Sequence, residues 1–415
     1  MAGRTAGPGP TWLAARRHRL LTRRLALGGL LCALPAGFLP SQAQQGDAAP
    51  AAGANACRVA LAGYDAGGHR VFRTIALALD RPGLVVTPLH TLERGGARWE
   101  RLAVEEESTG STAATEVTGV ASLDPAADLA YLSVPGSPSC AAQAAGDAAA
   151  GAGTPAAPAG QAGTQVLVLR ERSGYRPSAA GGQILRQVAL PGGRRLILAR
   201  LLDARGAEPG LMIDASGALV GSVAPAPPGS DQALLAVVAA APPPSGEDSD
   251  PTPPRSVLAA RAAPTFSGTP AGIAAQALLL GGAGRTESAI ESLDDALLRG
   301  GETAALLLER GTLQYASGRL PAAVRDFSRA AQVDPSSYLA RFNLGVVLGA
   351  SGRYDEAAAA FREARDLAPS NPRVRFELAL ALRAGDHGEA ARGELETLDR
   401  LDPTLARELR LLLGF

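Results

Sequence analysis

Residues 304–337 read AALLLERGTLQYASGRLPAAVRDFSRAAQVDPSS, and residues 338–371 follow at once with YLARFNLGVVLGASGRYDEAAAAFREARDLAPSN. Both stretches carry glycine, alanine, phenylalanine and proline at matching places. The matching residues lie 34 positions apart: Gly311 and Gly345, Ala323 and Ala357, Phe327 and Phe361, Pro335 and Pro369. An interval this constant is the signature of a repeat architecture.

The interval extends beyond these two stretches in both directions. The further members of the columns are Ala289 and Ala391, Leu293 and Leu395, Gly284, Gly318 and Gly352, Pro403, and Ala277 and Ala379 at the first glycine position. Four units fit, at about 270–303, 304–337, 338–371 and 372–405. Residues 405–415 are expected to form a terminal helix that covers the open end of the array.

Each unit is predicted to be a pair of antiparallel helices. Small residues let the two helices approach, a glycine provides the turn between them, and a proline ends the second helix. This pattern resembles the tetratricopeptide-repeat (TPR) family. The resemblance implies an all-α solenoid with a concave groove that binds peptides or protein segments.

Four polar residues on the predicted first helices are candidates for binding a partner in that groove: Arg310, Gln314, Arg341 and Asn343. The alternative is that they are ordinary solvated side chains, and the sequence leaves both interpretations open.

The N-terminal residues have the composition of an export signal. A basic segment contains Arg16, Arg17, Arg19, Arg23 and Arg24, and residues 25–39 form an apolar stretch too short for a comfortable membrane span. Ser41-Gln42-Ala43 provides a small-x-small cleavage site. We therefore expect residues 1–43 to be a signal peptide of the general or twin-arginine type, and the mature protein to be periplasmic or secreted. An uncleaved N-terminal anchor is the alternative.

Residues 44–56 are a short leader, and cleavage before Gln44 leaves two cysteines, Cys57 and Cys140. An oxidising compartment permits one disulfide between them, and two buried thiols are the alternative.

The middle of the chain, residues 57–240, predicts an all-β domain. Short runs rich in valine, isoleucine and leucine are separated by turn residues, as in an antiparallel barrel or sandwich. Residues 141–163 are almost wholly alanine, glycine and proline and are expected to be an insertion. Residues 241–269 are expected to form a proline-rich linker, after which the repeats begin at Pro270.

Three segments of this domain resemble the trypsin-like serine proteases. Residues 83–92, GLVVTPLHTL, resemble the segment that presents the catalytic histidine, here His90. Residues 123–132, LDPAADLAYL, resemble the segment with the catalytic aspartate, here Asp128. Residues 206–221, GAEPGLMIDASGALVG, resemble the nucleophile loop and the hairpin after it. The resemblance implies a trypsin-like double β-barrel with triad-equivalent positions in the order His90, Asp128 and Glu208.

Glu208 stands where this family has its attacking serine. A carboxylate at that position is a poor nucleophile towards a peptide, and its charge opposes the oxyanion that catalysis must stabilise. The resemblance therefore implies a pseudoprotease. Ser178 and Ser222 are the nearest alternative serines, but neither has the flanking glycines that expose a nucleophile. The alternatives are that His90 is an exposed loop histidine, that Asp128 caps a turn, and that Glu208 is a solvated loop carboxylate.

The sequence thus predicts a multi-domain protein, an all-β trypsin-like double β-barrel followed by an all-α TPR solenoid. The expected function is that of an exported protein-binding scaffold, and the alternative is an active serine endopeptidase whose TPR array binds substrate or partner. A folding or envelope-assembly helper is indistinguishable from the first. The 40 basic and 40 acidic residues cancel, so no basic field favours nucleic acid. No residue pattern calls for a cofactor or metal.

Overall fold

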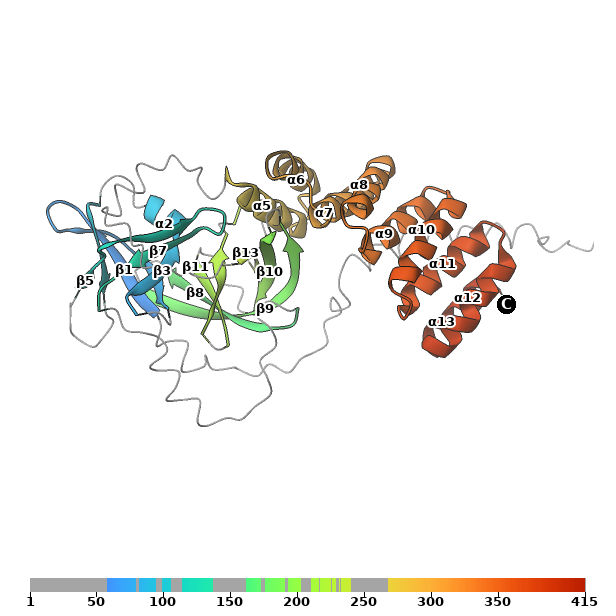
Figure 1. Cartoon of the computed structure of the whole chain (residues 1–415), viewed down its shortest axis with the longest axis horizontal. Coiled ribbons are helices and arrows are strands. Elements are labelled where there is room, and N and C mark those ends of the chain that lie inside the picture. Colours follow the sequence, from blue (N-terminus) through green and yellow to red (C-terminus); the bar gives the residue numbers. More distant parts are fainter. Residues whose placement is uncertain are drawn as a thin grey trace, which may run out of the picture. The chain divides into compact units, whose positions relative to one another are not determined.

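We describe the protein from a computed structural model (Figure 1). It describes residues 58–79, 82–94, 99–105, 114–136, 162–172, 176–190, 193–202, 210–215, 217–224, 226–228, 231, 233–239 and 268–414. The predicted signal peptide, leader and disulfide, Glu208, and nearly all of the predicted insertion and linker lie outside these residues. Two compact units are present, and the division falls between Gly301 and Glu302.

The first half of the β-rich unit is a seven-stranded antiparallel sheet in the order β5-β4-β1-β2-β3-β7-β6. Its strands are β1 (Arg58–Tyr64), β2 (Arg70–Ala78), β3 (Leu84–Pro88), β4 (Arg101–Glu105), β5 (Ala114–Glu116), β6 (Gly119–Asp124) and β7 (Leu129–Ser133). A short helix, α2 (Leu89–Arg94), follows β3 directly. The sheet encloses an apolar core that includes Leu61, Trp99 and Leu132.

At Gly63 the neighbouring strand packs too closely to leave room for a side chain. A Cβ atom there would lie 2.1 Å from Cε1 of Phe72, and the register between β1 and β2 shifts at the next residue. Phe72 in turn meets the buried Trp99 edge-on, with ring centroids 6.2 Å apart. Only glycine lets the aromatic ring lie flat against β1 at this point.

The second half of the β-rich unit is a closed barrel of six strands in the order β10-β13-β12-β11-β8-β9. Its strands are β8 (Gln165–Arg172), β9 (Arg176–Ala189), β10 (Arg195–Leu201), β11 (Gly210–Asp214), β12 (Leu219–Val223) and β13 (Leu234–Ala239). Its interior is filled by aliphatic side chains such as Ile184, Ile197 and Met212. The predicted all-β architecture is confirmed, with one closed barrel and one sheet.

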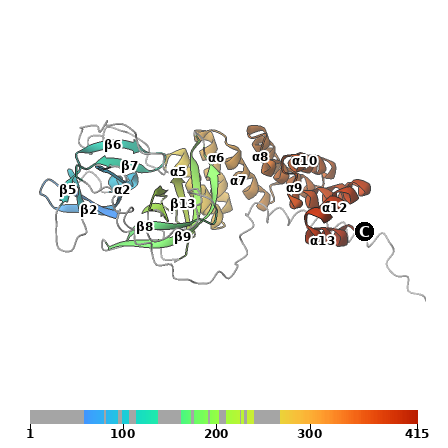
Figure 2. The same cartoon turned by 60° about the horizontal axis from the view of Figure 1, so that its bottom comes forward.

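Nine helices follow in residues 268–414. They are α5 (Pro270–Gly282), α6 (Thr286–Gly300), α7 (Ala304–Ala316), α8 (Leu320–Val333), α9 (Tyr338–Ala350), α10 (Tyr354–Leu367), α11 (Pro372–Ala384), α12 (Gly388–Leu401) and α13 (Pro403–Leu413). The pair α5 and α6 belongs to the compact unit of the β strands, and α5 packs on β13. Helices α7–α13 belong to the other unit. Figure 1 shows α9–α12 following one another in sequence order, and Figure 2 shows α9, α10 and α12 in the same order.

The helix ends repeat with the same interval as the core residues. Thr269, Thr303, Ser337 and Asn371 each occupy an N-cap, and each side chain accepts a backbone N–H of the first turn. Such caps satisfy donors that the helix leaves unpaired. The turns inside the pairs use left-handed glycines, with φ of 75° at Gly284 and Gly318 and 77° at Gly352.

In two of the pairs, α7–α8 and α9–α10, a glycine of the first helix lies against a phenylalanine of the second. A Cβ on Gly311 would lie 2.7 Å from Cε1 of Phe327, and one on Gly345 would lie 2.8 Å from Cδ1 of Phe361. Phe361 is fully buried and meets Phe342 edge-on at 5.4 Å. The predicted role of the small residues, which is to let the two helices approach, is confirmed.

Candidate functional site

His90 lies where β3 ends and α2 begins. Pro88 pairs with Leu129 at the end of β3, and the backbone N–H of Leu89 donates to the carbonyl of Asp128 at 2.9 Å. This pairing brings the first turn of α2 against the turn that precedes β7. His90 and Asp128, 38 positions apart in the sequence, are therefore neighbours in the fold.

Asp128 has an uncommon backbone conformation, with φ of 56°, and is only 1% exposed. The turn before it is held by Asp124, whose side chain accepts from the N–H of Ala127 at 3.1 Å. Arg194, at the start of the barrel's hairpin, donates to the same Asp124 carboxylate at 2.8 Å. These contacts fix the turn that aims the Asp128 side chain at His90.

The Asp128 carboxylate accepts three hydrogen bonds. The backbone N–H of His90 donates to Oδ1 at 2.8 Å, the Nδ1 atom of His90 contacts Oδ2, and the hydroxyl of Ser222 donates to Oδ2 at 2.9 Å. A carboxylate that orients the Nδ1 side of an imidazole leaves Nε2 as the atom able to take a proton. The three side chains thus form one buried polar network, with His90 at its end.

The Nε2 atom of His90 is buried and has no hydrogen-bond partner among the described residues. The imidazole as a whole is only 6% exposed. Buried polar atoms are normally paired, and an unpaired one calls for an explanation. The nucleophile-equivalent residue Glu208 lies outside the described residues, so the structure does not place it relative to Nε2.

Ser222 has a role that the sequence reasoning missed. It lies on β12, paired with Leu211 and Val238, and is 1% exposed. Its hydroxyl donates to Oδ2 of Asp128, the same oxygen that Nδ1 of His90 contacts, and it makes no hydrogen bond with Nε2, the nitrogen that would activate a nucleophile. Its position in an apolar strand was the available signal, because a buried hydroxyl there needs a polar partner. Ser178 lies on β9, without a described side chain.

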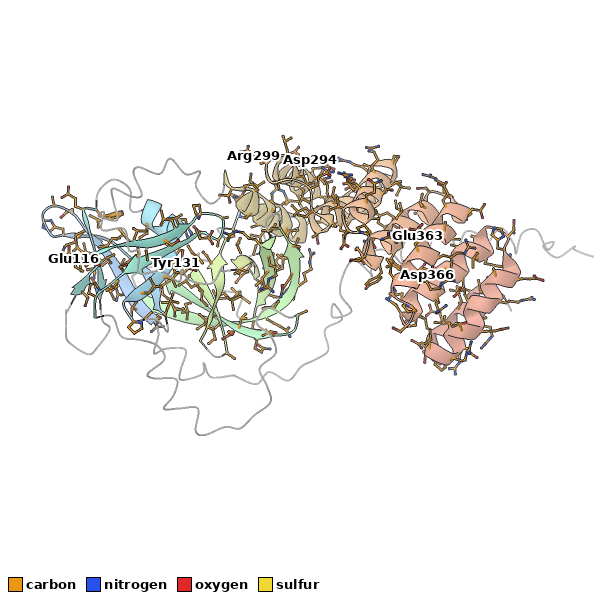
Figure 3. The ribbon with its side chains drawn as sticks, in the orientation of Figure 1. Glu116, Tyr131, Asp294, Arg299, Glu363 and Asp366 are labelled. Carbon is orange, nitrogen blue, oxygen red and sulfur yellow. The ribbon has the colours of Figure 1, made fainter. Side chains whose placement is uncertain are left out.

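Tyr131, labelled in Figure 3, lies three residues beyond Asp128 on β7. Burial raises the pKa of Tyr131 to about 12, the negative charge of Asp124 adds to the effect, and Arg194 opposes it. The phenol therefore stays neutral beside the turn.

Two of the predicted partner-binding residues are ion-paired to second helices. Arg310 forms two hydrogen bonds to Asp326 of α8, at 2.7 and 2.6 Å, and Asp326 is buried. Arg341 donates to Glu363 of α10 at 3.0 Å. These contacts turn both guanidinium groups towards the second helix of their own pair. Their assignment to partner binding stays a prediction.

Gln314 and Asn343, the other two predicted residues, are both buried, at 9% and 5% exposure. The Oε1 atom of Gln314 has no hydrogen-bond partner among the described residues. Gln314 lies one turn after Arg310, on the side of α7 that faces α8. On α9, Gly345 contacts α10, and Asn343 lies on the opposite side of the helix from Gly345. The predicted set therefore divides between two sides of the first helices.

Among the residues that the structure describes, no group of histidine, cysteine and carboxylate side chains has the geometry to hold a metal ion. No helix within the described ranges has the length and apolarity needed to cross a membrane.

Comparison with known proteins identifies the helical array. A tetratricopeptide-repeat family model matches residues 274–338, 308–372 and 342–406. Residues 274–406 are therefore tetratricopeptide repeats, as the 34-residue interval predicted. No curated protein matches the chain.

Three solved structures illustrate the similarities. The Rv3671c protease of M. tuberculosis in its active form is 22% identical, with 46% of this chain and 80% of that chain covered and a TM-score of 0.33. YrrB, described as a TPR protein with an unusual peptide-binding site, is 20% identical over 34% and 74%, with a TM-score of 0.32. MamA from Desulfovibrio magneticus RS-1 is 16% identical over 32% and 76%, with a TM-score of 0.31. At these scores the likenesses carry no functional argument.

Proposed function

We propose that this protein is an exported scaffold whose TPR array binds segments of other proteins and whose β domain is a trypsin-like protease fold that no longer cleaves peptides. The observation that carries the proposal is the run of tetratricopeptide repeats over residues 274–406. Such repeats generally bind protein or peptide partners through the surface that their stacking creates.

The proposed loss of catalysis rests on Glu208. Acyl transfer needs a hydroxyl or thiol that His90 can deprotonate and donors aimed at the developing oxyanion. A carboxylate at the nucleophile position provides neither. Ser222, the serine nearest to His90 in the described network, is committed to Asp128.

The second candidate function is an active serine endopeptidase. One observation favours it, namely the intact and buried contact of His90 with Asp128, which is the arrangement that orients a general base. Under this alternative a serine outside the described residues approaches Nε2.

A fluorophosphonate probe separates the two functions. If the protein is a scaffold, the probe labels neither the purified chain nor the His90→Ala variant. If the protein is a peptidase, the probe labels the purified chain, and the labelling disappears in His90→Ala and when one serine is replaced.

Partner binding is tested with a matched pair of surface changes. Thr312 of α7 and Thr397 of α12 both donate to the carbonyl four residues earlier, so arginine disturbs each helix alike. The chain from Gln44 is immobilised and captured proteins are identified by mass spectrometry. We expect Thr312→Arg to abolish capture of specific proteins and Thr397→Arg to retain it. Equal capture by both variants contradicts a groove on the first helices.

The proposed pseudoprotease site has its own test. If the Glu208 carboxylate pairs with Nε2 of His90, replacing Glu208 by alanine removes that contact and changes the environment of the imidazole. NMR chemical shifts of the His90 ring in both proteins measure this change, and coincident spectra refute the pairing. Export has a separate test. If residues 1–43 are removed on export, mass spectrometry of the exported protein will find Gln44 as its N-terminal residue.

A further inference from the structure

The helix pairs α5–α6, α7–α8, α9–α10 and α11–α12 are called repeats 1 to 4 below. Helix α5 of repeat 1 is buried along most of its length, since every residue of 271–279 except Gln276 is buried. A helix that is apolar all round has to be covered on more than one side. Here α6 packs on one side of α5, and strand β13 of the barrel packs on it as well. Repeat 1 is therefore held by the β domain in addition to its own pairing.

The contact between α5 and the barrel is close at Gly282, the last residue of α5. A Cβ atom there would lie 2.4 Å from Cδ2 of Leu234, the first residue of β13. The equivalent positions of repeats 2 to 4 hold Ala316, Ala350 and Ala384. Only repeat 1 lacks a side chain at this position, and its absence gives room to the barrel.

The connection that leaves repeat 1 differs from the later connections. Pro335, Pro369 and Pro403 hold equivalent positions after repeats 2 to 4, whereas repeat 1 ends with Gly300 and Gly301. Gly301 has φ of 86° and ψ of 164°, a conformation that is essentially restricted to glycine. Proline fixes φ, whereas glycine leaves the backbone free to rotate. The chain is therefore stiffer after the later repeats than after repeat 1.

Repeat 2 also differs from repeats 3 and 4 at a position that packs between repeats. Leu344 of α9 packs against the cluster that contains Phe327 of α8, the second helix of the repeat before it. Leu378 holds the same place in repeat 4, but repeat 2 has Arg310 there. The guanidinium of Arg310 forms two hydrogen bonds to Asp326 within repeat 2, at 2.7 and 2.6 Å. Repeat 2 thus carries an ion pair where the later repeats carry an apolar packing residue.

We propose that the helical array works as two parts. Repeat 1 is a fixed part of the β domain, and repeats 2 to 4 with α13 form the partner-binding part, which turns about Gly300 and Gly301. The division between the two compact units falls between Gly301 and Glu302, in agreement with this pivot. The assignment of partner binding to repeats 2 to 4 rests on the proposed function, whereas the motion can be measured without a partner. A protein segment held by repeats 2 to 4 can then take several orientations towards the β domain.

The test measures distance distributions between pairs of spin labels by double electron–electron resonance. It uses the chain from Gln44, and the labels are attached to noncanonical ketone side chains, so that Cys57 and Cys140 stay unchanged. Three pairs of exposed positions are labelled: Arg195 of β10 with Glu291 of α6, Glu291 with Arg362 of α10, and Arg362 with Glu396 of α12.

The three pairs have different expected widths. The pair 195 and 291 spans the contact between the barrel and repeat 1, and the pair 362 and 396 lies within repeats 3 and 4, so we expect narrow distributions for both. The pair 291 and 362 spans the connection at Gly301. We expect its distribution to be at least about twice as wide, because units that are not joined by a large apolar interface move relative to one another.

Variants at the connection test the pivot itself. Gly300→Asp with Gly301→Pro gives repeat 1 the Asp-Pro sequence found at residues 334–335 and 402–403. We expect this change to narrow the distribution of the pair 291 and 362, because proline fixes φ. Gly393→Ala, inside α12 where a Cβ meets nothing within 4 Å, is the matched control and should leave the width unchanged. If melting shows that the Asp-Pro variant disturbs the fold, Arg310→Leu with Asp326→Ala, which gives repeat 2 the residues of repeat 3, is expected to narrow the same distribution.

The outcomes separate this inference from the function on which it partly rests. A distribution for the pair 291 and 362 as narrow as those of the other two pairs overturns the inference, and so does a wide distribution that neither variant narrows. Both results leave the scaffold function standing if Thr312→Arg, in repeat 2, abolishes capture of partner proteins. A wide distribution that the variants narrow, in a chain whose capture does not depend on Thr312, supports the pivot and overturns the scaffold function.

Discussion

Replacing Gly345 by alanine has two opposite effects on the stability of the helical array. In the interior of helix α9, alanine is favoured over glycine by about 1 kcal/mol, because glycine loses more backbone freedom on folding. The new Cβ, however, would lie 2.8, 2.8 and 2.9 Å from three ring atoms of Phe361. That ring is fully buried and packed edge-on against Phe342, so it has little room to retreat.

The steric term decides the outcome. Overpacking of a well-filled core costs about 1–3 kcal/mol. After the gain in helix propensity is subtracted, we expect Gly345→Ala to lower the free energy of unfolding by up to about 2 kcal/mol. For an array of this size the melting temperature should fall by about 2–4 °C per kcal/mol, as measured by the far-ultraviolet ellipticity of the helices.

Gly393 provides the matched control. It lies in the interior of α12, and a Cβ there would meet nothing within 4 Å. Gly393→Ala should therefore stabilise the array by up to about 1 kcal/mol. In the Gly345→Ala background, Phe361→Leu should cost less than it does alone, because it removes the ring atoms in conflict. A Gly345→Ala protein as stable as Gly393→Ala would refute the packing argument.

Three further changes test other parts of the structure. Asp386 has φ of 63° at the turn position where three other repeats have glycine, so Asp386→Gly should stabilise the array by about 1 kcal/mol, measured by urea unfolding; a destabilised protein would contradict this. Ser222→Ala removes a buried donor from Asp128 and should destabilise the β domain by about 1–2 kcal/mol, reported by the emission of the buried Trp99; an unchanged midpoint would show that the hydrogen bond is dispensable. Burial acts to raise the pKa of Glu105, but hydrogen bonds from Tyr64 and Arg70 and the charges of Arg70 and Arg73 outweigh it and lower the pKa below its ordinary 4.5. The ionised Glu105 therefore contributes to the free energy of unfolding above pH 4.5, and this contribution is lost as the pH falls through the folded-state pKa. Glu105→Gln should lower the free energy of unfolding by about 1 kcal/mol or less near neutrality and should leave it unchanged in strong acid. An equal loss of stability at both pH values would rule out this dependence on ionisation.

The helical array could be predicted because the residues that pack its helices together recur at a fixed interval in the sequence. Gly345 and Phe361, for example, each belong to a series of equivalent residues with this interval, and they contact each other in the structure. The helix caps were missed, although Thr303, Ser337 and Asn371 follow the same interval. Capping residues vary in identity while their hydrogen bond is kept, so a search for identical residues passes over them.

In the β domain, the sequence predicts an all-β architecture but not how its strands pair. Strand β1, with its alanines and Gly63, has weak intrinsic strand propensity, and its conformation comes from pairing with β2 and β4 on both sides. The contact between His90 and Asp128 was anticipated by a family resemblance. Ser222 was not, because its partner Asp128 is 94 positions away and only the folded chain brings the two together.

The network around Asp128 also bears on what an intact histidine–aspartate pair means. His90 and Asp128 belong to the seven-stranded sheet, whereas Ser222 belongs to the barrel, so the Asp128 carboxylate joins the two halves of the β domain. Removing any of its donors leaves a buried carboxylate undersatisfied, which is costly whether or not the protein cleaves peptides. Folding stability alone is therefore sufficient to maintain the pair, and its presence is weak support for catalysis.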